Sequence, residues 1–475
     1  MVSADNLPFD VLPLIFANVP GRKDLLSVAL VSKSFNGAAT PLIYGSITIN
    51  VSVTKKLTKR VSSSPRAQLR LTSRQAQSPF QTLLDRKDLY KFPRKLTITA
   101  VPLDRGRVSE RFHIVLAMAL PKLVNLSSFV FDAHLTVSFL PALLSNLATP
   151  SQLKELSLLA DNLNPQQAKL LLHIGHRTKL DRGGSLQKLS LRSPSTCVLG
   201  VLPEWIERNR ASMTSLSIKD SPSITSGFIQ LLLGYTRYLT HLSLTQCPNL
   251  NHWLLMKTLE TLPGLIKLQL AIFTYSPSPG ATYQLTCLKH LSLHFMGSLP
   301  ADSTPKLKAT LSGFLAFFAT CTLESFMLES MDQIVLPVET VKDWSSCLFG
   351  SLRCFNIVGV TILPDSLELL CRRTKLLEQI CLDFEPEMAR SSLLLRALSK
   401  SESLQTITDS FDFRYHHHQG APGQPTRFTR PEVETIFAQI STLKRIINAG
   451  RCWVRSSECS LKAQVCRHRR ESSLT

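Results

Sequence analysis

The stretch Leu-Thr-His-Leu-Ser-Leu-Thr-Gln-Cys-Pro-Asn-Leu, from Leu239 to Leu250, contains the pattern that decides the fold. Its core, Leu-x-x-Leu-x-Leu, recurs with copies that start at Leu153, Leu186, Leu239, Leu265 and Leu288. Looser copies with other apolar residues start at Leu126, Met213, Leu323, Leu352 and Leu377, and weak ones at Leu96, Leu404 and Leu443. The alternation of apolar and polar residues predicts a short strand in every copy, with one side buried.

The spacing of the copies predicts how these strands are connected. Between Leu126 and Leu404 the copies lie about 26 residues apart, within the roughly 20–29-residue period of leucine-rich repeats. Apolar residues at helical spacing fill the second half of several intervals, as at Phe314–Phe318. A strand and a helix cannot bury their apolar sides alone, so neighbouring units must stack. We therefore expect an α/β fold, a right-handed solenoid with a curved parallel sheet inside and helices outside.

The copy at Leu239 resembles the cysteine-containing type of leucine-rich repeat that often accompanies F-boxes. It is the only copy with a Cys at that place, Cys247, so the subtype depends on one repeat and on the period. We expect the solenoid to span residues 92–455, with about 11–13 repeats that are clearest over residues 126–407.

The first 47 residues show a helical pattern instead. From Asn6 the chain reads Asn-Leu-Pro-Phe-Asp-Val-Leu-Pro-Leu-Ile-Phe. Apolar residues recur at the spacing of one helical face, at Val11, Leu12, Ile15, Phe16 and Val19. Some forty residues supply too little core for independent stability, so we expect exposed apolar surface that a partner covers.

Four residues predict where these helices begin and end. Pro8 suits the first turn of a helix, and Asp24 is placed to cap a second one. Pro41 should end a third helix. Pro13 falls inside the expected first helix, where a proline costs roughly 3 kcal/mol.

This segment resembles an F-box, the helical module that binds the Skp1 adaptor of cullin-type ubiquitin ligases. The resemblance covers residues 6–47, and we take residues 1–48 as this domain. Phe35 stands where the family often has Trp. The resemblance implies that seven residues contact Skp1: Leu7, Pro8, Leu12, Ile15, Leu25, Val31 and Phe35. The alternative is an ordinary helical cap on a larger domain.

Composition restricts the class of protein and its compartment. With 475 residues, 44% apolar and 19% charged, the chain is globular and long enough for a large core. No apolar run approaches the length of a membrane helix, and the N-terminus lacks a basic-then-apolar signal region. The 11 Cys residues are scattered and odd in number, which indicates free thiols in a reducing compartment. We expect a cytoplasmic or nuclear protein without a membrane partner.

The net charge of +20 is unevenly distributed. Residues 51–95 carry a surplus of ten basic residues, and residues 420–475 a surplus of six. We interpret residues 49–91 as a basic, partly disordered linker insertion and residues 456–475 as a basic tail. Nucleic-acid binding, or a nuclear import signal at residues 55–60, is the alternative. It is disfavoured because no aromatic residues are interleaved with the charges.

A search for catalytic motifs finds no phosphate-binding loop, Gly-x-Ser-x-Gly or His-Glu-x-x-His. His416, His417 and His418 precede a Gly- and Pro-rich loop and lack supporting metal ligands. Cys452, Cys459 and Cys466 recur every seven residues with His468 close behind, a spacing that fits no paired zinc motif. We expect no enzyme, no catalytic residue, no metal and no cofactor.

The remaining candidate is the sheet surface that points away from the helices. Strand alternation turns the residues between the core leucines toward this surface. Its central column is rich in Ser, which suits a tightly curved sheet and says nothing about a ligand. The flanking columns supply the candidate substrate-binding residues Lys188, Arg192, Lys219, His241, Lys267, His290 and His294. Later repeats carry Glu329 and Asp383, so an acidic part of a partner should lie over the early repeats.

Taken together, the chain resembles the large fungal set of F-box proteins with leucine-rich repeats. The resemblance implies a substrate receptor of a Skp1–cullin–F-box ubiquitin ligase. Its partners would be a Skp1-like adaptor, through it a cullin, and an unknown protein target. Two alternatives stay open: a Skp1-binding scaffold without a role in ubiquitin transfer, and a basic nucleic-acid-associated repeat protein.

Overall fold

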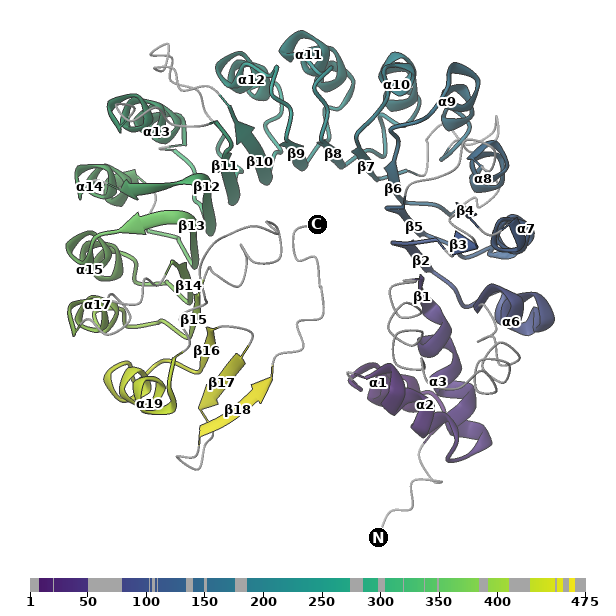
Figure 1. The fold of residues 1–475 in the computed structure, drawn as a ribbon, viewed down its shortest axis with the longest axis horizontal. Coiled ribbons are helices and arrows are strands. Elements are labelled where there is room, and N and C mark those ends of the chain that lie inside the picture. Colours follow the sequence, from purple (N-terminus) through teal and green to yellow (C-terminus); the bar gives the residue numbers. More distant parts are fainter. Residues whose placement is uncertain are drawn as a thin grey trace. The chain divides into compact units, whose positions relative to one another are not determined.

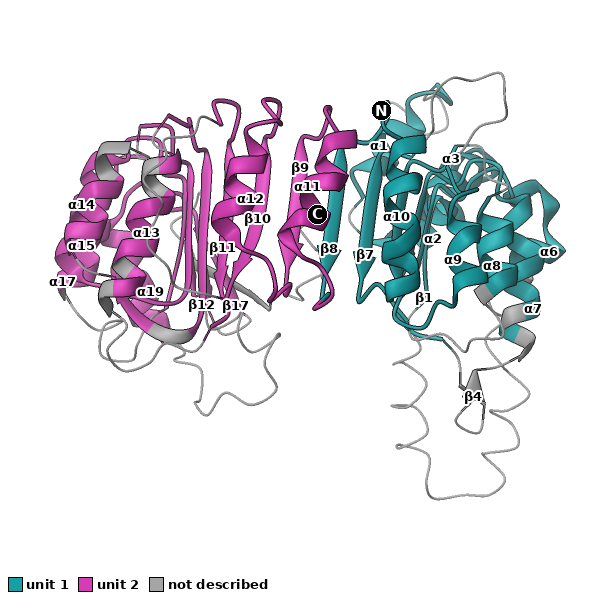
Figure 2. Cartoon of the chain, turned by 90° about the horizontal axis from the view of Figure 1, so that it is seen from above, with its two compact units in different colours: residues 1–221 teal, residues 222–475 magenta. Residues whose placement is uncertain are grey.

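The structure is a computed structural model of the chain. It describes residues 8–19, 21–49, 79–101, 103–104, 107–108, 110–133, 140–148, 152–175, 186–273, 285–297, 304–318, 320–336, 338–347, 350–383, 392–409, 428–448, 451–455 and 461–465. The chain divides into two compact units, unit 1 (residues 1–221) and unit 2 (residues 222–475), coloured separately in Figure 2. Each unit is described by itself.

Unit 1 begins with three helices, α1 (Leu12–Ala17), α2 (Arg22–Ala29) and α3 (Lys33–Gly45). A parallel sheet follows, with strands β1 (Ser46–Ile49), β2 (Lys95–Ile98), β5 (Ser128–Phe131), β6 (Glu155–Leu159), β7 (Lys188–Arg192) and β8 (Ser215–Lys219). The helices between them are α6 (Pro79–Asp85), α7 (Glu110–Ala119), α8 (Leu140–Leu147), α9 (Pro165–Leu171) and α10 (Thr196–Arg208). The short strands β3 (Leu103–Asp104) and β4 (Arg107–Val108) form a separate antiparallel pair.

Unit 2 continues the alternation of strand and helix. Its strands are β9 (His241–Thr245), β10 (Lys267–Ile272), β11 (His290–Phe295), β12 (Ser325–Leu336), β13 (Cys354–Ile362), β14 (Gln379–Leu382), β15 (Thr406–Asp409), β16 (Arg445–Asn448), β17 (Arg451–Arg455) and β18 (Leu461–Val465). Its helices are α11 (Ser226–Tyr235), α12 (His252–Leu259), α13 (Thr304–Phe318), α14 (Val338–Cys347), α15 (Pro364–Arg373), α17 (Ser392–Leu398) and α19 (Arg430–Gln439). In each unit the repeat helices lie along one face of the sheet (Figures 1 and 2).

The repeated pattern forms this sheet as the sequence predicts. Each Leu-x-x-Leu-x-Leu copy becomes a strand, and in-register pairing stacks Leu156 on Leu189 and Leu189 on Leu216. All three side chains are essentially inaccessible to water. The α/β repeat architecture is therefore confirmed, because the leucine rows form one continuous core between the sheet and the helices.

Hydroxyl side chains fasten neighbouring repeats together. In several repeats a Ser or Thr just before the first core residue donates a hydrogen bond of 2.8 or 2.9 Å to a carbonyl of the preceding repeat. These residues are Ser212, Ser351, Ser403 and Thr442. The bonds satisfy backbone carbonyls at the turns, where ladder hydrogen bonds end.

The first helix begins later than the sequence suggests. Because α1 starts at Leu12, Pro8 precedes it, and the Pro8 carbonyl accepts a 3.0 Å turn hydrogen bond from the Val11 amide. Pro13 consequently lies in the first turn, where its missing N–H costs no intrahelical bond. The expected penalty for an interior proline does not arise.

The ends of α2 and α3 also differ from expectation. Gly21, not Asp24, is the N-cap of α2, and Asp24 lies in the first turn, where a negative charge suits the helix dipole. Pro41 does not end α3, which continues to Gly45. Buried residues on both sides of Pro41 pack against α1 and α2, and this packing outweighs the local cost of the proline.

Ordered elements also occur inside the expected linker and tail. Helix α6 lies within the 49–91 range, and β1 continues directly from α3 and pairs with β2. Strand β18 lies within the 456–475 range and pairs antiparallel with β17. Its Leu-Lys-Ala-Gln-Val sequence alternates apolar and polar residues, a strand signal that the basic charge obscures. Residues 51–78, 456–460 and 466–475 are outside the described part of the chain.

Candidate functional site

The three N-terminal helices share a small core of their own. Its buried residues are Leu12, Phe16, Ala29, Ala38, Ala39 and Ile43. The Phe16 and Phe35 rings meet edge to face with centroids 5.2 Å apart. The Asn36 side chain donates a 3.1 Å hydrogen bond to the Ala29 carbonyl and so ties α3 to the end of α2. This core holds the helices together and leaves their other faces to solvent.

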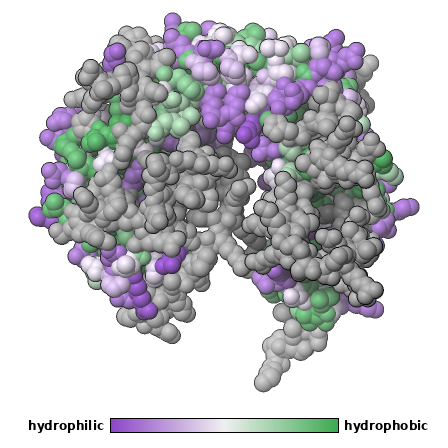
Figure 3. All heavy atoms as spheres, viewed as in Figure 1, coloured by the Kyte–Doolittle hydropathy of each residue, from purple (hydrophilic) through white to green (hydrophobic). Residues whose placement is uncertain are grey.

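Those outer faces expose large apolar side chains over a short stretch of sequence. The exposed residues are Phe9, Val11, Leu14, Ile15, Leu26, Leu30 and Val31, here called the apolar face of α1–α2. Leu30 is 85% exposed, and Leu14 and Val31 are each 68% exposed. Figure 3 shows hydrophobic residues in green at this end of the chain. Exposed apolar residues gathered on so small a module make this face a candidate binding surface.

The structure divides the seven predicted Skp1 contacts into groups. Pro8, Ile15 and Val31 are exposed, whereas Leu12 is buried in the module's own core. Leu25 and Phe35 are partly buried against that core. Leu7 is outside the described residues.

The predicted Skp1 contacts do not include five members of the apolar face: Phe9, Val11, Leu14, Leu26 and Leu30. The Phe9 ring lies against α3, where a Cβ on Gly37 would be 3.4 Å from it. The signal was available, since apolar residues occupy more than one face of helices this short. Periodicity alone did not reveal which face turns inward.

A second candidate surface is the open sheet face, meaning the strand side chains that point away from the repeat helices. Unit 1 carries Lys188, Arg192 and Lys219 of the predicted set. Arg192 binds Asp132 at 2.9 Å and Asp220 at 3.0 Å. Burial disfavours its charge, but these two carboxylates outweigh that effect and raise the pKa of Arg192. Lys188 and Lys219 are exposed and form no ion pair with any described residue.

Unit 2 carries His241, Lys267, His290 and His294 of the predicted set. Lys267 is in register with His241 on one side and His290 on the other, so the three form a half-buried row across β9, β10 and β11. Burial lowers the pKa of His290, Glu324 raises it, and Lys267 and Lys289 lower it again. His294 differs from the others because it is only 9% exposed.

The acidic residues expected on later repeats are engaged within unit 2. Glu329 Oε2 lies 2.5 Å from His294 Nδ1, and Asp383 Oδ2 accepts a 2.8 Å hydrogen bond from the Gly359 amide. These carboxylates order their own repeats, so the open face of β12–β14 is less acidic to a partner than the sequence suggests.

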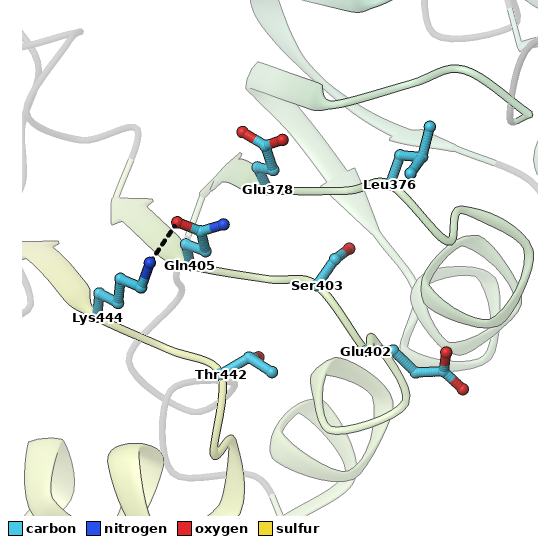
Figure 4. A pocket seen from close by; sticks show the side chains of 7 residues that line it. All are labelled: Leu376, Glu378, Glu402, Ser403, Gln405, Thr442 and Lys444. Atoms are coloured by element: carbon cyan, nitrogen blue, oxygen red, sulfur yellow. Dashed lines mark hydrogen bonds between the residues drawn. The ribbon is translucent and has the colours of Figure 1, made fainter.

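A shallow pocket of about 310 Å³ lies at the turns that precede β14, β15 and β16. Figure 4 shows its lining: Leu376, Glu378, Glu402, Ser403, Gln405, Thr442 and Lys444. Lys444 Nζ donates a 3.1 Å hydrogen bond to Gln405 Oε1, and Glu378 pairs with Arg353. The lining mixes both signs of charge with a single apolar residue, Leu376, so it selects no class of ligand.

Several residues singled out in the sequence lie outside the described part of the chain. They are His416, His417, His418, Cys459, Cys466 and His468. Cys452 is buried in β17. Among the described residues, no three His, Cys, Asp or Glu side chains are grouped to hold a metal ion. Over the same residues, no helix is long and apolar enough to span a membrane.

Comparisons with known proteins find matches only among solved structures. No family model matches the sequence, and no curated protein does. Among solved structures, the chain is similar to Rad7 in its complex with Elc1 in yeast, with 17% identity, 68% of this chain and 71% of that chain covered, and a TM-score of 0.39. It is also similar to LegL7, a leucine-rich-repeat protein from Legionella pneumophila, with 16% identity, 72% and 97% coverage, and a TM-score of 0.39.

TLR13 in complex with ssRNA13 matches at 16% identity and a TM-score of 0.36, with 76% of this chain covered but only 50% of that chain. These likenesses are remote in sequence. The conclusion that the chain is a leucine-rich-repeat protein therefore follows from its own strands and buried leucine rows.

Proposed function

We propose that the chain is the substrate-recognition subunit of a Skp1–cullin–F-box ubiquitin ligase. In this proposal α1–α3 act as an F-box that binds a Skp1-like adaptor, and the repeats bind a protein target. The chain performs no chemistry of its own. It raises the effective concentration of the target near the ubiquitin-loaded enzyme, in the cytoplasm or nucleus.

The observation that carries this proposal is the apolar face of α1–α2. Its residues are exposed although α1–α3 have an ordered core beneath them. Burial of one such side chain contributes roughly 1.5–3 kcal/mol, so a few of them suffice for a specific interface. The resemblance of residues 6–47 to an F-box supplies the identity of the partner.

The test measures binding of the purified full-length chain to purified Skp1. Ile15→Glu and Val31→Glu together place two charges on the apolar face without touching the module's core. We expect affinity to fall by about a hundredfold or more, since both charges would be buried at the interface. The matched control is Leu231→Glu, the same kind of change at a residue of α11 that is 49% exposed. The control should bind as the unmodified chain does.

Two results would contradict the proposal. One is no binding by the unmodified chain to Skp1 that is active on a known F-box. The other is an equal loss of binding in Leu231→Glu. Salt-dependent binding to nucleic acid with no Skp1 binding would favour the nucleic-acid-associated alternative. A Skp1-bound chain whose depletion changes the turnover of no protein would favour the scaffold alternative.

A further inference from the structure

The open sheet face of β9–β11 is arranged in rows by the strand register. Its first row is His241, Lys267 and His290, and its second begins with Ser243 and Gln269. These five half-buried residues are here called the histidine patch. The sequences of the three strands, His-Leu-Ser-Leu-Thr, Lys-Leu-Gln-Leu-Ala-Ile and His-Leu-Ser-Leu-His-Phe, contain no acidic residue. The patch therefore combines the positive charge of Lys267 with two imidazole rings, each of which can take up a proton.

A hydrogen-bond relay orders the second row of the patch. Ser243 Oγ donates to Gln269 Oε1 at 3.1 Å, and Gln269 Nε2 lies 2.9 Å from His294 Nε2. Ser292 Oγ lies 2.9 Å from the same nitrogen. The relay crosses β9, β10 and β11 and fixes which way the Gln269 amide faces.

The relay ends on a carboxylate, and this determines the tautomer of His294. Glu329 Oε2 is 2.5 Å from His294 Nδ1, and an ionised carboxylate can only accept. Nδ1 therefore donates to Glu329, and Nε2 accepts from Gln269 Nε2, because an amide nitrogen can only donate. His294 holds Glu329 on the β12 side and Gln269 on the β10 side. It acts as a positioning residue, because the ring itself is nine-tenths buried.

We propose that the histidine patch binds an acidic, extended segment of a partner protein, with carboxylates placed against Lys267 and the two flanking imidazoles. Charge complementarity favours such a partner, because the face is built from basic and polar side chains that are half-buried. The inference deepens the receptor role proposed above by naming the class of target segment, and it rests on that role for calling the partner a target.

Binding of such a segment is coupled to protons. The groups that face His290 are Glu324, Lys267 and Lys289, and burial adds to the two lysines in disfavouring its charged form. His241 Nδ1 lies 2.8 Å from Thr240 Oγ1, and Lys267 is its in-register neighbour. A carboxylate brought against either ring favours the protonated form. The complex therefore takes up protons and is tighter at lower pH.

The test uses the full-length chain and a fluorescein-labelled peptide of alternating Glu and Ser, followed by fluorescence anisotropy near pH 6 and near pH 8. We expect binding that is about threefold or more tighter near pH 6. Lys267→Glu should weaken it by at least about tenfold, because like charges would then oppose each other. His241→Gln with His290→Gln should keep weaker binding and lose its pH dependence. Gln keeps a polar side chain of similar length at both positions.

The matched control is Lys257→Glu on α12, an exposed lysine of the same unit on the helix side of the sheet. It should bind the peptide as the unmodified chain does. Thermal melting of each variant shows whether it is folded. A peptide of alternating Lys and Ser should not bind.

Three results would overturn the inference. The first is no binding of the acidic peptide at either pH, and the second is equal weakening by Lys257→Glu and Lys267→Glu. The third is tighter binding of a single-stranded oligonucleotide than of the acidic peptide at the same patch, which would assign the patch to nucleic acid. Skp1 is absent from this assay. Failure here alongside intact Skp1 binding would refute the patch alone and leave the proposed adaptor role standing.

Discussion

Two leucines, Leu216 of the repeats and Leu30 of the N-terminal helices, have opposite environments. Leu216, in β8, is fully buried in the core of unit 1, whereas Leu30, at the end of α2, is 85% exposed. The two leucines differ in what packs around them: the leucine row of Leu216 continues on the paired strand β7, whereas Leu30 is absent from the core that α1–α3 share. The comparison teaches that apolar content alone does not identify a core. Where the fold supplies no neighbour, the same residue type points to a partner.

The largest test of this contrast is a pair of truncations, Leu216→Ala and Leu30→Ala. The first leaves a cavity in a close-packed core and should lower the free energy of unfolding by about 2–5 kcal/mol. The second removes a solvated side chain and should change it by less than about 0.5 kcal/mol. Urea unfolding followed by circular dichroism measures both. Similar midpoints for the two variants would show that Leu30 is packed and would break the comparison.

A second test compares how acid changes the stability of the two regions. The repeats bury the titratable side chain of His252, whereas the core cluster of α1–α3 is apolar. Burial lowers the pKa of His252 from 6.5 to about 4, and its ring packs against Phe314 at a centroid distance of 5.3 Å. The unfolded chain binds the proton below about pH 6.5 and the folded chain does not until about pH 4. The contribution of His252 to the free energy of unfolding is therefore fully present above pH 6.5. It decreases by up to about 3 kcal/mol as the pH drops to 4.

His252→Leu should remove this part of the acid sensitivity, as measured by urea midpoints between pH 7 and pH 4. The sensitivity of unit 2 should decrease, and that of α1–α3 should stay as it was. An unchanged pH profile in the variant would show that His252 is protonated in the folded chain.

The smallest expected effect concerns how α3 begins. Ser32 caps α3 by accepting a 3.1 Å hydrogen bond from the Phe35 amide. Ser32→Ala should destabilise the module by about 1 kcal/mol. Ser34→Ala, at an exposed position in the first turn of the same helix, is the control and should cost less. Hydrogen exchange of the α3 amides reports both changes, and equal exchange in the two variants would argue against the cap.

The sequence predicts the repeated strands well because period and leucine spacing are local properties. Even the weak copies at Leu96, Leu404 and Leu443 fall at strands of the sheet. The sequence predicts the ends of α1 and α3 less well. Whether Pro13 lies inside a helix depends on where α1 begins, and whether Pro41 ends α3 depends on the packing around that helix. Strand β18 was not predicted, because the basic residues around it in the sequence indicated a tail.

The candidate sites were predicted in part. The sequence identified His294 as an outward residue, but its partner Glu329 lies on the next strand, and no local pattern reveals that hydrogen bond. Of the predicted Skp1 contacts, Ile15 and Val31 are exposed, whereas Leu12 is buried in the core of α1–α3. Which side of a short apolar helix faces inward depends on the helix packed against it, and spacing alone does not contain that information.

The most direct test of the central claim is hydrogen exchange of the full-length chain with and without Skp1. The account predicts slower exchange confined to α1, α2 and the residues that join them, with the repeat strands unchanged. Protection that appears on the repeat strands instead, or no protection anywhere at saturating Skp1, would contradict the assignment of the apolar face of α1–α2 as the adaptor-binding surface.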